Sequence, residues 1–292
     1  MNSRPPTQTR CAANVHVCSL LFILASATGA LGAAAGLARA DSASTSELSA
    51  AQIVSRNEQA RGGLEAWRKV QTLVFSGQMR VPPPAGGARA QRGKLDPIAI
   101  PFILALRRPN LSRLEIVYHG EPVVKIFDGK DGWMLRSMED KWIAVPMPAA
   151  MAQAEAEQGS IEGPLLDAQA KGHQVSVEGV DSLDGKPAYR LAVSLASGAI
   201  QHVWIDKSSF LDVKMDAVRE INGRAIPVAI WFGDYRASDE LMIARRIETR
   251  ALDGTPVETQ IIDSVAINPA IEAARFQKPP AKSPTPVKPI KP

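Results

Sequence analysis

The chain has 292 residues, of which 45% are hydrophobic and 22% are charged, and its formal net charge is +4. The positive balance comes from the first 40 residues, which hold three arginines and no acidic residue, so the remainder has 31 basic and 30 acidic residues. A nucleic-acid-binding protein carries a concentrated basic face, and the sequence shows none. The remaining chain of about 250 residues is long enough to bury a sizeable core.

Residues 1–40 have the three parts of a secretory signal peptide. Arg4 and Arg10 supply the positive start, residues 15–24 are apolar, and residues 38–40 form a cleavage site of the A-x-A type. The alternative is an uncleaved membrane anchor, because the apolar stretch and the Ala/Gly-rich part after it are together long enough to span a bilayer. We expect cleavage, and therefore a periplasmic protein exported by its leader.

The chain after the leader begins with helices. Ser49 is a good N-cap, and the residues after it predict a helix that reaches Ala60 and ends at Gly62-Gly63. Residues 64–69 predict a further short turn of helix that carries Trp67.

About nine short strands with alternating apolar residues follow. Asp-Gly and Asn-Gly dipeptides separate several of them, and these dipeptides favour tight hairpin turns because they tolerate a positive φ. The predicted strands include residues 73–81, 98–106, 114–118, 124–126, 133–135, 189–195, 211–215, 226–232 and 257–265, and the turn dipeptides are Asp128-Gly129, Asp184-Gly185, Asn222-Gly223 and Asp253-Gly254.

Helical segments interrupt the strands in the middle of the chain. Residues 148–158 are rich in Ala, Gln and Glu and predict a helix, and Gly163-Pro164-Leu165 predicts the start of a second one through Ala170. The predicted fold is therefore mainly β: a single unclosed, strongly curved antiparallel β-barrel with a helical lid. One domain spans residues 41–279, and the Pro/Lys-rich residues 280–292 form a disordered tail.

Residues that carry chemistry are sparse. Both cysteines lie in the leader, and the three histidines after it, His119, His173 and His202, have no metal-ligand spacing. No nucleophile motif and no phosphate-binding glycine loop is present. We therefore expect no metal, no cofactor and no enzymatic activity.

The strongest functional signal is apolar sequence on both faces of residues 98–106, which is typical either of plain core or of a strand that lines a cavity. The sheet as a whole favours a cavity for an apolar ligand. We expect this cavity to be lined by Ile98, Ile100, Phe102, Leu104, Leu114, Ile116, Tyr118, Val124, Ile126, Trp133, Trp204, Val228, Ile230 and Phe232.

Two further groups of residues border the predicted cavity. Arg107, Arg108 and Arg113 flank apolar strands and predict a cavity mouth that meets a cargo head group, the alternative being solvated strand ends. Met147 and Met151, with Leu165, predict a lid, because flexible methionines suit a lipid-facing surface. The alternative is a short amphipathic helix that simply packs on the sheet.

Seven segments, taken together and in order, resemble a known family. They are ARGGLEAW (60–67), RRPNLSRLEI (107–116), FDGKDGW (127–133), IEGPLLDAQAKGH (161–173), VWIDKSSFLDVK (203–214), FGDYR (232–236) and VAINPAIEAARFQKP (265–279). They resemble the outer-membrane lipoprotein-sorting protein family, a branch of the LolA/LolB-like superfamily, over residues 47–279. The resemblance implies an unclosed β-barrel covered by helices that works in the periplasm and shields the acyl chains of lipoproteins.

The residues and the resemblance lead to the same expected function. We expect a monomeric carrier or chaperone that holds the acyl chains of a lipoprotein or other lipid in an apolar cavity, with envelope proteins as further partners and no nucleic acid. The alternative is a non-transport lipid sensor or assembly factor that uses the same barrel together with the C-terminal tail.

Overall fold

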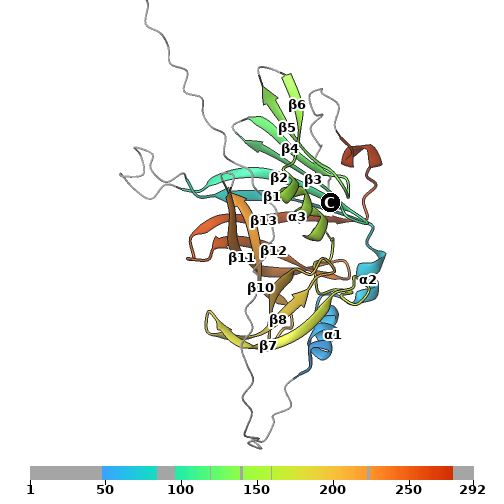
Figure 1. The fold of residues 1–292 in the computed structure, drawn as a ribbon, viewed down its shortest axis with the longest axis vertical. Coiled ribbons are helices and arrows are strands. Elements are labelled where there is room, and N and C mark those ends of the chain that lie inside the picture. The colour runs from blue at the N-terminus through green and yellow to red at the C-terminus, as the bar shows by residue number, and fades with distance from the viewer. Residues whose placement is uncertain are drawn as a thin grey trace, which may run out of the picture.

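Thirteen antiparallel strands form one sheet in the part of the computed structural model that is described here, residues 48–83, 96–118, 120–138, 141–158, 160–221 and 224–278 (Figure 1). The strands are β1 (Thr72–Val81), β2 (Ile98–Arg107), β3 (Leu111–Tyr118), β4 (Glu121–Phe127), β5 (Gly132–Met138), β6 (Lys141–Pro146), β7 (Gln174–Leu183), β8 (Lys186–Ser194), β9 (Ile200–Asp206), β10 (Asp212–Ile221), β11 (Arg224–Ser238), β12 (Leu241–Ala251) and β13 (Pro256–Ile267).

The order of the strands shows how the chain builds the sheet. From β1 the chain adds strands outward to β6, which is one edge, and β7 begins at the opposite edge. The chain then returns strand by strand to β13, which pairs with β1 in the middle of the sheet. The described strands β6 and β7 do not pair with each other, so the sheet is not closed.

The mainly β fold class is confirmed, but the expected number of about nine strands was too low. The longest strand that the sequence did not single out is β12, which lies between β11 and β13. Arg245 and Arg246 stand in the middle of β12 and interrupt its hydrophobic alternation, which is the signal that predicts a strand. Backbone pairing on both sides places this polar stretch in the sheet despite its composition.

The two N-terminal helices form where the sequence predicts them. Helix α1 (Ala50–Ala60) starts with a capping box, in which the Ser49 hydroxyl accepts from Gln52 N and the Gln52 side chain accepts from Ser49 N. The chain then turns through Gly62 into α2 (Leu64–Lys69). A Cβ on Gly62 would lie 2.1 Å from the carbonyl oxygen of Glu240, so this close approach to the sheet requires glycine.

In the central helical region, one of the two predicted helices forms. Helix α3 (Ala149–Gln158) is confirmed, whereas the second predicted helix, residues 163–170, was wrong. Residues 161–172 form a series of turns, because Gly163 and Asp167 both adopt a positive φ that interrupts a helical backbone. In Figure 1 this region connects the strands near β6 with those near β7.

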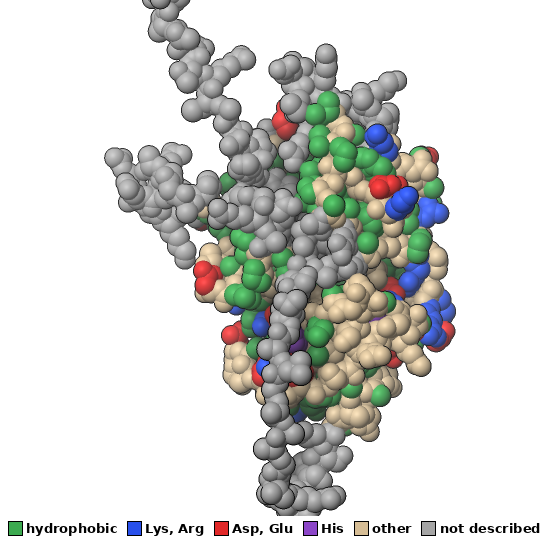
Figure 2. Space-filling model, in the orientation of Figure 1, with side chains coloured by type: hydrophobic (Ala, Val, Ile, Leu, Met, Phe, Trp, Pro, Cys, Tyr) green, Lys and Arg blue, Asp and Glu red, His purple; other side chains and the backbone are tan. Residues whose placement is uncertain are grey.

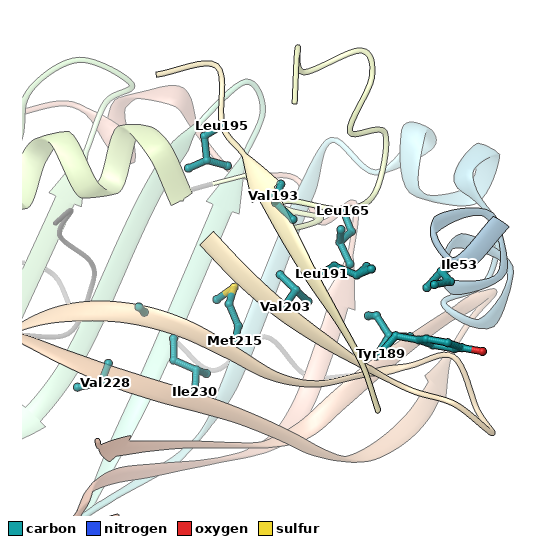
Figure 3. Close-up of a cluster of buried hydrophobic side chains, with 12 residues drawn as sticks. Ile53, Leu165, Tyr189, Leu191, Val193, Leu195, Val203, Met215, Val228 and Ile230 are labelled. Carbon is teal, nitrogen blue, oxygen red and sulfur yellow. The ribbon is translucent and has the colours of Figure 1, made fainter. Parts of the chain in front are cut away.

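Register defines two faces of the sheet, because residues paired across antiparallel strands point to the same side. A path of cross-strand pairs, with one step of two residues along β12, joins the strands from β9 to β2 and defines the inner face. It runs through Val203, Met215, Ile230, Thr249, Ile247, Gln260, Met79 and Ile100. Ile53 of α1 and Leu165 lie against this face, beside Tyr189 and Leu191 (Figure 3).

The opposite, outer face is partly covered by the end of the described chain. A 3₁₀ helix, η1 (Ala273–Phe276), places the fully buried Phe276 against Val74 and Ala105. Asn268 fastens the segment that leads to it, because its side-chain oxygen accepts from Gln71 N at 2.6 Å. The C-terminal segment therefore belongs to the folded domain.

The predicted leader (1–40) and tail (280–292) lie outside the described residues, as do the Asn222-Gly223 turn and residues 84–95. Within the described ranges, no helix is both long enough and apolar enough to cross a membrane.

Replacing Phe276 by alanine is expected to lower the free energy of unfolding by about 3 kcal/mol, because it empties a fully buried aromatic site. Urea unfolding of the purified protein measures the change. The exposed neighbour Gln277 provides the control, and Gln277→Ala should change stability by about 0.5 kcal/mol at most. Equal effects of the two substitutions would contradict the assignment of η1 to the core.

Candidate functional site

The inner face carries a continuous apolar surface. Side chains of β1, β2 and β3 form one buried cluster around Met79 and Phe102, and side chains of β8 to β11 form another around Leu191 and Val203. Ile247 of β12 packs against both clusters and joins them. The apolar surface therefore extends over most of the width of the sheet.

Ten of the fourteen predicted lining residues lie on this inner face. They are Ile98, Ile100, Phe102 and Leu104 of β2, Leu114, Ile116 and Tyr118 of β3, and Val228, Ile230 and Phe232 of β11. Leu104 and Phe232 are half-buried, whereas Ile100 and Ile116 are each 1% exposed.

The other four predicted lining residues, Val124, Ile126, Trp133 and Trp204, lie on the outer face. The register pairs Val124 with Glu115 and Ile126 with Arg113, so the expectation of one shared surface was wrong for β4. Trp133 pairs with Ile126 and therefore also lies on the outer face.

Trp204 lies on the outer face of β9, where it pairs with Arg190 and Lys214. The Lys214 ammonium is 3.7 Å from the centre of the Trp204 ring, and the indole N–H donates to Asp181. Trp204 is therefore held in a network of charged groups and does not reach the inner apolar surface.

Helix α3 lies at the inner face over β3 to β5, and two of the three predicted lid residues belong to it or precede it. Met147 and Met151 form a buried cluster with Met134 of β5. A Cβ on Gly132 would lie 2.3 Å from the Met147 sulfur, so a larger residue at this position would require the Met147 side chain to shift. Leu165, the third predicted lid residue, belongs to the cluster of β8 to β11 instead.

Polar contacts fix the C-terminal part of α3. The Ser112 hydroxyl donates to the carboxylate of Glu155 at 3.1 Å, and both groups are buried. The Asn110 amide donates to the carbonyl oxygens of Glu155 and Ala156, near the end of the helix where carbonyls lack helical partners. The start of β3 and the turn before it therefore hold α3 in place.

The turns after α3 are held by a cluster of charged groups around Glu162, which is 5% exposed. We define the Glu162 cluster as Glu162, Arg61, Arg108 and Lys171. Arg108 Nη2 lies 2.9 Å from Glu162 Oε2 in an ion-pair contact, and Lys171 Nζ lies 3.2 Å from Oε1. Arg61 of α1's C-terminal end donates to the Glu162 carbonyl oxygen at 2.9 Å.

The basic members of the Glu162 cluster also satisfy backbone carbonyls. Arg108 donates to Val70 O at 2.7 Å and to Trp67 O at 3.1 Å, which ties the β2–β3 turn to α2. Lys171 donates to two carbonyls of its own turns. Burial lowers the pKa of Lys171, although the charge of Glu162 acts in the opposite direction.

The three arginines of the predicted mouth do not lie together, so that expectation was wrong as a single site. Arg108 joins the Glu162 cluster, but Arg107 donates to the carbonyl of Ile271 on the way to η1. Arg113 contacts Glu115 and donates to the carbonyl of Arg275 on the outer face. Arg107 and Arg113 fasten the C-terminal segment because β2 and β3 direct them away from the inner face.

The sequence reasoning did not assign a role to Glu162 or Lys171. Both lie in the segment IEGPLLDAQAKGH, which contributed to the family resemblance, but an acidic residue beside a glycine is an ordinary turn signal. Their partners Arg61 and Arg108 are distant in sequence, so only the folded chain brings the four together.

A cavity of about 680 Å³ lies beside the Glu162 cluster. It opens between the central turns, the β2–β3 turn and the strands β9 and β10. Its lining is Gln71, Arg108, Pro109, Asn110, Ala156, Ser160, Glu162, Gly163, Pro164, Asp167, Ala170, Lys171, His173, Gln201 and Met215. In Figure 2, hydrophobic side chains gather where Figure 1 places β3 to β6, and basic ones follow the edge where α2 lies. The described residues contain no cluster of His, Asp and Glu that suits a metal ion.

Comparisons with known proteins place the fold. The sequence matches no family model and no curated protein. A LolA superfamily protein from Nitrosomonas europaea has a similar structure, with a TM-score of 0.50 and 12% identity over 79% of this chain and 99% of that one. The expected LolA-like fold is therefore found among solved structures, and at this identity the likeness concerns the fold.

Two further solved structures are similar at slightly lower scores. A putative outer membrane lipoprotein-sorting protein domain from Vibrio parahaemolyticus has a TM-score of 0.48 and 10% identity over 77% of this chain and 95% of that one. A DUF1329 family protein from Desulfovibrio piger has a TM-score of 0.49 and 11% identity over 78% and 97%.

Replacing Glu162 by glutamine is expected to lower the free energy of unfolding by about 3 kcal/mol, because Arg108 and Lys171 lose the charge that compensates them in a buried setting. Chemical denaturation measures it. Glu65 is the matched control, since its side chain is 79% exposed and Glu65→Gln should change stability by about 0.5 kcal/mol at most. A loss as small as that of the control would show that the Glu162 cluster does not hold the turns.

The ion pair between Arg68 and Asp167 predicts that the free energy of unfolding depends on pH. Arg68 donates to both carboxylate oxygens of Asp167, at 3.0 and 2.9 Å, and these hydrogen bonds lower the pKa of Asp167 below its ordinary value of 3.8. The stabilisation is therefore complete above pH 3.8 and is lost as the pH falls through the lower, folded-state pKa. Because the Arg68 side chain is 48% exposed, solvent screens the pair and the stabilisation is small.

The substitution Asp167→Asn tests this dependence. The difference in unfolding free energy between the natural protein and the variant should be present at neutral pH and should shrink once the pH falls below 3.8. Denaturation curves at a series of pH values measure the difference. A difference that stays constant into the acid range would contradict the assignment.

Proposed function

We propose that this chain, which shares its fold with a LolA superfamily protein, is a non-enzymatic carrier that shields the acyl chains of a lipoprotein or another lipid. The observation that carries the proposal is the joined apolar surface on the inner face of the unclosed sheet. In this proposal the sheet is a strongly curved open barrel, and α3 is part of its helical lid. The leader pattern of residues 1–40 supports a periplasmic location.

The energetics of acyl-chain burial suit a carrier. Each CH₂ group removed from water contributes about 0.8 kcal/mol, so a 16-carbon chain contributes on the order of 10 kcal/mol before the costs of association. A carrier must also release its cargo. Release is compatible with this value because the loss of translational freedom and the ordering of the chain offset a large part of it.

The position of α3 supports its role as a lid. It rests on β5 through methionines, whose flexible side chains can repack around an acyl chain, and its polar anchors lie at the end next to the Glu162 cluster. Displacing the methionine end would uncover β4 and β5 without breaking the Glu162 cluster. The lid therefore has a soft contact at one end and a fixed contact at the other.

A polar side chain on the inner face tests the proposal. Leu104→Gln places an amide in the apolar surface and is expected to weaken the binding of a fluorescent 16-carbon fatty acid about tenfold, because burying an unpaired amide costs about 1–3 kcal/mol. Fluorescence titration measures the affinity. Val117→Gln is the control, since Val117 is 48% exposed and lies on the other face.

Three outcomes separate the candidate functions. Saturable binding that Leu104→Gln weakens and Val117→Gln leaves unchanged supports an acyl-chain site. Absence of binding in the folded natural protein would overturn the carrier. Binding without transfer of the fatty acid between donor and acceptor vesicles would favour the alternative of a lipid sensor or assembly factor.

A further inference from the structure

We propose that the 680 Å³ cavity beside the Glu162 cluster binds an uncharged, hydrogen-bond-donating lipid head group, such as a glycerol or an amide, and disfavours an anionic one. The inference rests on the proposed function, because it requires an acyl chain on the inner face. It goes further by assigning the head group a separate site and a chemical class.

The two cationic side chains that line the cavity already have partners within the protein. Arg108 donates to two backbone carbonyls and to Glu162, and Lys171 donates to two carbonyls and lies 3.2 Å from the same carboxylate. Among the charged residues that line the cavity, two are basic and two, Glu162 and Asp167, are acidic. An anionic head group would therefore meet a balanced set of charges and would have to displace the buried Glu162 to gain a cation.

Three polar atoms of the lining can accept a hydrogen bond from a ligand. Asn110 uses its amide N–H groups on two carbonyls of α3, and its buried Oδ1 has no partner among the described residues. Gln201 likewise donates through Nε2 to the carbonyl of Asp216, which leaves its Oε1 to accept. His173 Nδ1 lies 3.0 Å from the carbonyl of Pro164 and must donate to it, so in the neutral ring Nε2 is an acceptor.

These three acceptors favour a ligand that donates hydrogen bonds. The buried Asn110 Oδ1 is costly while it has no partner, and a hydroxyl or amide N–H from a ligand recovers that cost. A carboxylate or a phosphate diester offers acceptors and no donors, so it cannot recover it. Hydroxyl and amide head groups therefore match the lining in both charge and hydrogen-bonding sense.

The cavity adjoins the apolar surface at Met215. This side chain lines the cavity and also belongs to the buried cluster of β8 to β11. Gln201 pairs in the sheet with Val193 of the same cluster. In Figure 3, Met215 and Val193 lie in the middle of the cluster, between Ile53 of α1 and Val228. A head group in the cavity would therefore lie next to the place where an acyl chain begins on the inner face.

Competition between lipids with the same chain tests the inference. Monopalmitoylglycerol, palmitate and palmitamide displace a bound fluorescent 16-carbon fatty acid from the purified protein, and each displacement is measured at neutral pH. The expected result is that monopalmitoylglycerol and palmitamide bind about tenfold more tightly than palmitate. Gln201→Leu combined with His173→Leu should reduce that preference to about twofold, with the reporter still bound.

The exposed position Ile200 provides the control, because it neighbours Gln201 but is 64% exposed, and Ile200→Ala should keep the full preference. Thermal melting of each variant verifies folding, and Gln201→Leu alone serves if the double variant is unfolded. Equal affinity for all three lipids, or a preference that survives in the variants, would overturn the head-group site and leave the carrier standing. If no lipid displaces the reporter and the reporter itself does not bind, both proposals fail.

Discussion

One constraint of topology shapes the whole molecule: β6 and β7 follow each other in sequence but occupy opposite edges of the described sheet. The chain between them must therefore cross the sheet, and it does so on the inner side through α3 and the turns of residues 161–172. Without polar anchors, this crossing would be held only by weak apolar contacts with the sheet. Its course is set by Glu162, whose carboxylate and backbone meet groups from α1, from the β2–β3 turn and from the crossing itself.

The crossing also divides the inner side into two chemical environments. Its first part, α3, meets the sheet through methionines, and its second part meets it through ion pairs and hydrogen bonds to backbone carbonyls. A buried ion pair stabilises a fold little more than an apolar contact does, but the loss of one partner leaves a buried charge uncompensated. The second part of the crossing is therefore costly to disturb and specific in geometry. A flexible apolar contact beside a rigid polar one is the arrangement that lets one end of a cover move while the other keeps its position.

The sequence predicted the fold class, both N-terminal helices and α3, because these depend on local signals such as the Ser49 cap and the Asp-Gly turns. It predicted the inner positions of β2 and β3 for the same reason. It could not predict which face β4 presents, since Val124 and Lys125 are both buried and the alternation there gives no preferred side. The register across the Gly120 turn decides it, and register is set by pairing with β3 rather than by composition.

Arg108 and Arg113 show why the site was harder to predict than the fold. They lie in one short segment, with similar neighbours and the same charge, yet one joins the Glu162 cluster and the other holds η1. What separates them is the partner that each meets, Glu162 in the crossing for the first and the chain near Arg275 for the second. An arginine on a strand end is recruited by whichever buried carbonyls and carboxylates the fold leaves without donors, because an unsatisfied buried acceptor is costly. The same rule makes Asn110 informative, since its buried Oδ1 is an acceptor without a partner among the described residues.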